Sequence, residues 1–120
     1  MRALVIDDSR AMRMIIRTAL QDLGYSCEEA ADGKEALGVL QKSGPFDIAL
    51  VDWNMPVLNG FEFVKAVRQD HGHDAMKLMM VTTEVETSQV CKALEAGANE
   101  YLMKPFTKDV LKDKLQMLVA

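Results

Sequence analysis

Several polar side chains of this sequence come directly after short apolar runs, where a buried strand would end. Asp7 and Asp8 follow Ala-Leu-Val-Ile, Asp52 follows Ile-Ala-Leu-Val, Thr82 follows Leu-Met-Met-Val, and Lys104 follows Tyr-Leu-Met. A single aspartate in such a place is usually a helix N-cap or a turn residue. Three carboxylates, a hydroxyl and an ammonium at four strand ends are better explained by one shared site.

Together these side chains would suit magnesium-dependent phosphoryl transfer. Neighbouring carboxylates repel one another unless a cation holds them. Oxygen ligands without nearby histidine or cysteine favour Mg²⁺, which keeps several waters and binds phosphate oxygens. Lys104 would complete a clamp on the phosphoryl group, and an aspartate can itself be the nucleophile that forms an acyl phosphate. We therefore predict that Asp52 is both nucleophile and metal ligand, beside Asp7 and Asp8.

The segments between these residues alternate between strand-like and helix-like patterns. Strict alternation predicts an α/β fold, a single doubly wound domain of five βα units with a parallel sheet and helices on both faces. In such sheets ligands bind outside the carboxyl ends of the strands. The expected strands are 3–6, 25–30, 47–52, 77–82 and 100–104, and the expected helices are 9–24, 32–44, 61–70, 84–97 and 107–119.

Some local features carry their own expectations. Ile15 belongs to the apolar face of the first expected helix. The segment 25–30 mixes charged and apolar residues, which is typical of a strand at the edge of a sheet. Asn59 and Gly60 read as a turn before the third helix, and Thr107 reads as the N-cap of the last one.

The composition limits the class of protein. The length of 120 residues suits one domain, and the formal net charge of −4 argues against direct binding of nucleic acid. The sequence has no signal peptide and no apolar run near the ~20 residues of a membrane span, so we expect a cytoplasmic protein without membrane insertion. Cys27 and Cys91 lie in apolar-periodic segments and are expected to be buried free thiols.

Four motifs, in this order, resemble the receiver domain of two-component response regulators: VIDDS, VDWNMPVLNG, VTTE and YLMKPF. The resemblance runs from about residue 3 to residue 118. DWNMP and AGANEYLMKPF are especially similar to the stand-alone, chemotaxis-type members of that family. It implies a phosphorelay function, a flavodoxin-like sheet with strand order 2-1-3-4-5, and one receiver domain over residues 1–120.

The resemblance also implies a role for each site residue. Asp52 would be the phosphoacceptor, which takes its phosphoryl group from a phosphohistidine of a histidine kinase. Asp8 and Asp52 would bind Mg²⁺ directly, together with the backbone carbonyl of Asn54. Asp7 would act largely through water, and Lys104 would pair with the phosphoryl group.

A conformational switch is implied as well. Thr82 would hydrogen-bond a phosphoryl oxygen, and Tyr101 would turn inward as Thr82 moves; otherwise Tyr101 is only a half-buried aromatic residue on an edge strand. The fourth helix, fifth strand and fifth helix would present the surface read by a downstream target, and a phosphatase is a possible further partner. The chain would be no conventional enzyme, but a signalling domain that assists its own phosphorylation and dephosphorylation. Four charged residues are expected to face solvent on that surface: Lys92, Glu95, Lys108 and Lys112.

Three alternative interpretations share parts of this pattern. A flavin mononucleotide module would need a glycine- and hydroxyl-rich loop where Asp7 and Asp8 stand, because acidic residues repel phosphate. A phosphatase of the haloacid dehalogenase type would need a second acid two residues after its nucleophile, where Asn54 stands. A receiver cut from a longer regulator with a separate output domain stays open.

Other residues near the motifs have simpler explanations. Trp53 is expected to be a partly exposed aromatic residue beside the site. His71 and His73 fall in a polar segment and are not expected to be ligands. Thr83 stands where relatives more often have a small residue, and the bond between Lys104 and Pro105 is expected to be cis.

Overall fold

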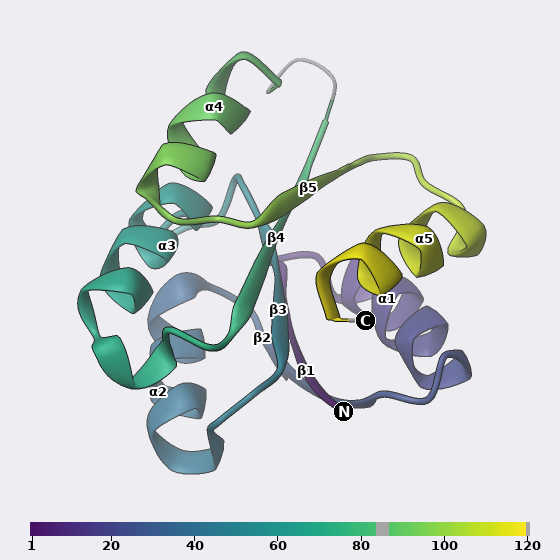
Figure 1. Cartoon of the computed structure of the whole chain (residues 1–120), viewed down its shortest axis with the longest axis horizontal. Helices are drawn as coiled ribbons and strands as arrows, with labels where there is room; N and C mark the ends of the chain where they lie inside the picture. The colour runs from purple at the N-terminus through teal and green to yellow at the C-terminus, as the bar shows by residue number, and fades with distance from the viewer. Residues whose placement is uncertain (84–86, 120) are drawn as a thin grey trace.

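The computed structural model describes residues 1–83 and 87–119, and strands and helices alternate along them (Figure 1). The strands are β1 Arg2–Ile6, β2 Ser26–Ala30, β3 Ile48–Asp52, β4 Lys77–Thr82 and β5 Glu100–Met103. The helices are α1 Arg10–Asp22, α2 Gly33–Ser43, α3 Gly60–Gln69, the short 3₁₀ helix η1 His71–His73, α4 Thr87–Ala96 and α5 Lys108–Val119. The α/β class predicted from the alternating pattern is confirmed; residues 84–86 of the fourth expected helix lie outside the described residues.

All five strands are parallel and form one sheet in the order β2-β1-β3-β4-β5. Helices α2, α3 and α4 cover one face of this sheet, while α1 and α5 cover the other (Figure 1). This is the doubly wound arrangement and the strand order that the resemblance implied. The charged strand β2 lies at an edge of the sheet, as its sequence predicted.

The sheet separates two apolar cores, and alternate residues of each strand enter different ones. In β1, Leu4 and Ile6 pack toward α2, α3 and α4, whereas Ala3 and Val5 pack toward α1 and α5. Both faces of the central strands are therefore buried, which explains why their sequences show continuous apolar runs.

Helix starts are fixed by short side chains that accept backbone hydrogen bonds. Ser9 accepts from the amide of Met12, and Thr107 accepts from the amide of Val110 at 3.2 Å. The turn expected at Asn59 and Gly60 is a helix start instead: Asn59 is the N-cap of α3 and forms a capping box with Glu62.

Two side chains that were expected to be buried are exposed, because neither faces a core. Cys91 is exposed on α4, although Cys27 is half-buried and both are free thiols. Ile15 is 58% exposed on α1 because the core-facing positions of that helix are Ile16 and Leu20. Helical periodicity identifies an apolar face, but its borders depend on how the helix sits on the sheet.

No helix in the described part of the chain is both long enough and apolar enough to cross a membrane. The bond between Lys104 and Pro105 is cis, as expected, and so is the bond between Gly44 and Pro45.

Candidate phosphoryl-acceptor and metal site

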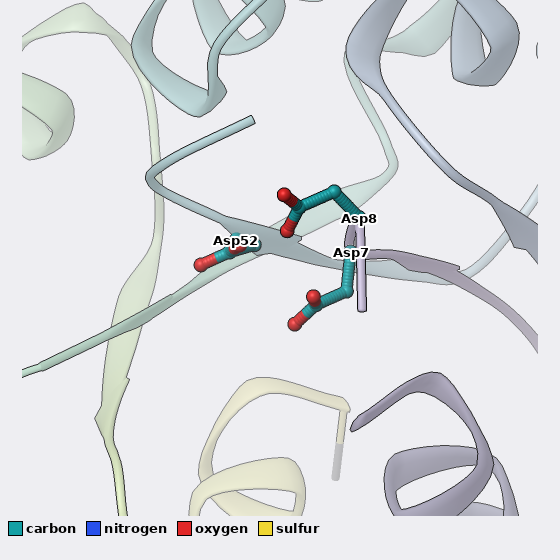
Figure 2. A group of neighbouring side chains, drawn as sticks. All are labelled: Asp7, Asp8 and Asp52. Carbon is teal, nitrogen blue, oxygen red and sulfur yellow. The ribbon is translucent and has the colours of Figure 1, made fainter. Parts of the chain in front are cut away.

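The polar residues singled out in the sequence lie at the carboxyl ends of the strands. Asp7 and Asp8 directly follow β1, Asp52 and Thr82 are the last residues of β3 and β4, and Lys104 directly follows β5. Because β1 and β3 are neighbouring parallel strands with Ile6 opposite Val51, their carboxyl ends bring the three aspartates together (Figure 2).

The three carboxylates form a compact group. One oxygen from each of Asp7, Asp8 and Asp52 lies within 4.8 Å of the others. Asp7 is 1% exposed and Asp52 is 7% exposed, whereas Asp8 is open to solvent. Three converging carboxylate oxygens, one of them reachable from water, fit a hard divalent cation, and these residues could hold one.

Lys104, directly after β5, supplies the positive charge of the site. Its Nζ lies 3.3 Å from Asp52 Oδ1 and 3.4 Å from Asp7 Oδ2. Burial alone would lower the pKa of Lys104, but the charges of Asp52 and Asp7 and its hydrogen bonds to them raise it. The ammonium is therefore a permanent cation between two of the three carboxylates.

The environment of Asp52 makes its ionisation costly. Burial of the carboxyl group and the like charge of Asp7 raise the pKa of Asp52 from 3.8 to about 6, although Lys104 opposes them. A bound cation would stabilise this unfavourably held charge. Metal binding would thus act directly on the buried carboxylate of Asp52.

The position of Asp7 is fixed from several directions. Its amide donates to Ala30 O at 3.1 Å, and its Oδ1 accepts from the amide of Ser9 at 2.8 Å. Its carbonyl oxygen accepts from Arg13 Nη1 at 2.6 Å. Sequence reasoning did not single out Arg13, because a helical arginine six residues after an aspartate is no recognised pattern.

Trp53 is buried, contrary to the expectation of partial exposure. It is 7% exposed and stacks on Phe61 of α3, with ring centroids 6.0 Å apart and an interplanar angle of 18°. Its backbone amide donates to Val81 O, and its carbonyl accepts from the amide of Gly60. Helix α3 therefore covers the residue next to Asp52, which only the tertiary structure could reveal.

Gly60 permits this close approach of α3 to β3. A Cβ atom at position 60 would collide with the backbone oxygen of Asp52 and lie 3.0 Å from Trp53 Cα. A glycine is thus required here because the backbone of α3 packs directly against the backbone of Asp52, the candidate nucleophile.

The two residues expected to form a switch lie on the neighbouring strands β4 and β5. Thr82 is fully buried at the end of β4, and its Oγ1 donates to Thr83 O at 3.3 Å. Tyr101, on β5, is half-buried against the core beneath α2, α3 and α4, with Lys114 Nζ 4.6 Å from its ring centroid. Their roles as a switch stay predictions.

The remaining candidates are simpler to place. Asn54 is exposed in the loop that follows Asp52, and the role of its backbone carbonyl stays a prediction. His71 and His73 form η1, which directly precedes β4. It therefore lies at the amino end of that strand, whereas the aspartates lie at the carboxyl ends of the strands.

Comparison with known proteins places the chain in a family. A model of the response regulator receiver domain matches residues 3–116. The chain belongs to the response regulator receiver family. It is 46% identical to a chemotaxis protein CheY homolog of Campylobacter jejuni, over 97% of this chain and 90% of that one. It is 43% identical to the chemotaxis protein CheY of Pseudomonas aeruginosa, over 98% and 95% of the two chains.

A solved receiver has the same fold. The chemotaxis response regulator CheY4 of Vibrio cholerae superimposes with a TM-score of 0.90 and 41% identity, over 98% of this chain and 97% of that one. Membership of the receiver family makes this chain a component of phosphorelay signalling. The flavin-binding and phosphatase alternatives are not favoured.

Proposed function

We propose that residues 1–120 form one receiver domain that accepts a phosphoryl group on Asp52 from the phosphohistidine of a histidine kinase. The observation that supports this most strongly is the group formed by Asp7, Asp8 and Asp52, with Lys104 3.3 Å from the Asp52 carboxylate. Since the relatives named above are chemotaxis proteins, we further propose that this chain acts in chemotaxis as a stand-alone regulator in the cytoplasm.

In the proposed reaction a carboxylate oxygen of Asp52 attacks the phosphorus atom of the donor. The new O–P bond forms as the N–P bond to the donor's imidazole breaks, and the imidazole leaves as the neutral base after taking a proton from solvent. The product is an acyl phosphate. Lys104 is positioned to pair with the transferred group, because it already contacts the accepting carboxylate.

Mg²⁺ is the proposed cofactor, held directly by Asp8, Asp52 and the backbone carbonyl of Asn54, and by Asp7 largely through water. When bound, it would neutralise charge that develops on the phosphoryl oxygens. The exposed Asp8 gives the cation a ligand that solvent can reach, while the buried Asp7 is held in place by its hydrogen bonds.

The proposed output is a shift between two arrangements of Thr82, Tyr101 and α4. Thr82 would hydrogen-bond a phosphoryl oxygen, and Tyr101 would then turn inward. A downstream protein would bind the surface formed by α4, β5 and α5, and a phosphatase would be a further partner. The chain would not bind nucleic acid directly. The charged residues expected on this surface are exposed: Lys92, Glu95, Lys108 and Lys112.

The chain would accelerate only its own modification, which distinguishes it from an enzyme with turnover on separate substrates. Its residues assist both the phosphorylation of Asp52 and the later hydrolysis of the acyl phosphate.

Incubation with acetyl phosphate and Mg²⁺, followed by intact-mass spectrometry, tests the proposal. We expect a mass gain of one phosphoryl group, which is lost in Asp52→Asn and in the presence of a chelator. The matched control is Asp109→Asn, at an exposed aspartate on α5, which should be labelled as well as the unaltered chain. Labelling of Asp52→Asn to the same extent would contradict the assignment of the acceptor.

A further inference from the structure

Arg13 connects the loop that carries Asp7 and Asp8 to the edge strand β2 through a single guanidinium. From the first turns of α1, its Nη1 donates to the backbone oxygen of Asp7 at 2.6 Å, and its Nε donates to Glu29 Oε1 of β2 at 3.2 Å. The side chain is only 16% exposed. One planar group thus joins a helix, an edge strand and the loop that carries two of the three aspartates.

The carbonyl that Arg13 contacts belongs to the peptide unit between Asp7 and Asp8. The parallel pairing of β1 with its neighbours ends at Ile6 opposite Ala30 and Val51, and the amide of Asp7 makes the last bond, to Ala30 O. Beyond that bond the chain turns toward α1. The hydrogen bond from Arg13 therefore fixes the orientation of the peptide from which the exposed Asp8 carboxylate extends.

Glu29 in turn fixes the plane of the Arg13 guanidinium. Its Oε1 accepts from Arg13 Nε, and its Oε2 accepts from Arg17 Nη1 at 2.7 Å. Arg17 is 46% exposed on its side chain and bonds to the other carboxylate oxygen of Glu29 from the one that Arg13 contacts. The two arginines share one carboxylate, and Arg13 also bonds to the aspartate loop.

We infer that Arg13, oriented by Glu29, is a positioning residue that sets the geometry of Asp7 and Asp8 for metal binding. The inference rests on the proposed function, because it concerns the proposed Mg²⁺ site. Second-layer groups that orient ligands commonly affect metal affinity by about 10-fold or more when they are removed. A lysine cannot replace Arg13, since one ammonium lacks the planar fork that serves two acceptors in different directions.

The test compares Mg²⁺ affinity in four chains: the unaltered protein, Arg13→Lys, Arg13→Gln and the control Arg17→Gln. The dissociation constant is measured by the fluorescence of Trp53 at a temperature where every chain is folded. It is measured independently from the rise of the melting temperature with Mg²⁺ concentration. We expect both Arg13 variants to bind Mg²⁺ roughly 10-fold more weakly, and Arg17→Gln to stay within about twofold of the unaltered protein.

A purely structural role for Arg13 would give a different pattern. In that case the Arg13 variants would melt at lower temperature but bind Mg²⁺ as tightly as the unaltered chain once folded, and the inference would be wrong. Equal weakening by Arg17→Gln would also overturn it, because within the described part of the chain Arg17 bonds to Glu29 and not to the loop that carries Asp7 and Asp8. If the unaltered protein bound no Mg²⁺, the proposed metal site itself would fail, and the inference with it.

Discussion

At the scale of single residues, the carboxyl group of Asp52 has a perturbed pKa. Its burial beside Asp7 raises its pKa to about 6, whereas an ordinary aspartate titrates near 3.8. The folded chain thus binds a proton at Asp52 more tightly than the unfolded chain does. The stability that this proton provides is fully present below about pH 4 and is lost as the pH rises through about 6.

This loss of stability with rising pH leads to a prediction for Asp52→Asn in magnesium-free buffer. The variant keeps an oxygen that can accept from Lys104 but carries no charge. We expect it to melt near the temperature of the unaltered chain at about pH 4, and several degrees higher at about pH 8. Differential scanning calorimetry across this range checks the trend. A difference in melting temperature that does not grow with pH would show that the site does not penalise the charge of Asp52.

Residue types and their positions after apolar runs were sufficient to predict that Asp7, Asp8, Asp52 and Lys104 lie together, because charged side chains at the ends of buried strands are costly without a partner. The orientation of the Asp7 carbonyl and side chain could not be predicted in the same way. It depends on Arg13 and Ser9, whose hydrogen bonds arise only when α1 packs beside β1 and β2.

At the scale of elements, the contact between β3 and α3 determines how Asp52 is presented. Helix α3 starts at Gly60, whose amide donates to Trp53 O, and Phe61 stacks on Trp53. The helix start therefore lies directly against the backbone of the strand end. A change at this contact would reach Asp52 without altering any charged residue.

Gly60→Ala is expected to destabilise the chain by about 2–4 kcal/mol, because the new methyl group meets the backbone of Asp52 and Trp53, which cannot move aside as a flexible side chain would. Urea unfolding measures the change. The matched control is Gly38→Ala in α2, where a Cβ atom would meet nothing within 4 Å. That variant is expected to stabilise the chain by about 0.5–1 kcal/mol, and similar effects of both variants would contradict the close packing of α3 on β3.

The element boundaries were largely predictable, since strand length, apolar periodicity and capping residues are local properties. Burial at the borders of elements was not. Trp53 follows a strand in a loop-like sequence, and nothing local indicates that Phe61 will cover it. Cys91 follows the buried Val90 on α4, and only the orientation of that helix on the sheet decides which of the two faces solvent.

At the scale of the whole molecule, metal binding and folding are linked. A ligand that binds only the folded chain raises its stability, by about 1.4 kcal/mol when the ligand concentration is ten times the dissociation constant. The cluster of Asp7, Asp8 and Asp52 depends on the relative positions of β1 and β3, which exist only in the folded sheet. Millimolar Mg²⁺ should therefore raise the melting temperature by several degrees.

Asp8→Asn should remove most of this Mg²⁺-dependent rise. It should also raise the melting temperature without Mg²⁺, because the charge at position 8 no longer repels the other two carboxylates. Differential scanning fluorimetry with and without Mg²⁺ measures both effects. Asp109→Asn should keep the full rise, and a normal rise in Asp8→Asn would exclude Asp8 as a metal ligand.

The α/β class was predictable from alternation and the strand order from the family resemblance, but the two-sided core was visible only in outline. Continuous apolar runs indicate burial on both faces of a strand, yet they do not show which residues meet which helices. The division of Leu4 and Ile6 from Ala3 and Val5 becomes clear once the strand order is known.

The contacts of Lys104 have a consequence for the charge balance of the site. Three carboxylates and one ammonium leave two net negative charges at the carboxyl end of the sheet, which one divalent cation neutralises. Phosphorylation of Asp52 would replace a single negative charge by a phosphoryl group with nearly two at neutral pH. With its cation bound, the site would therefore be neutral before phosphorylation and anionic after it, so the net charge of the metal-bound site would itself report whether the chain is phosphorylated.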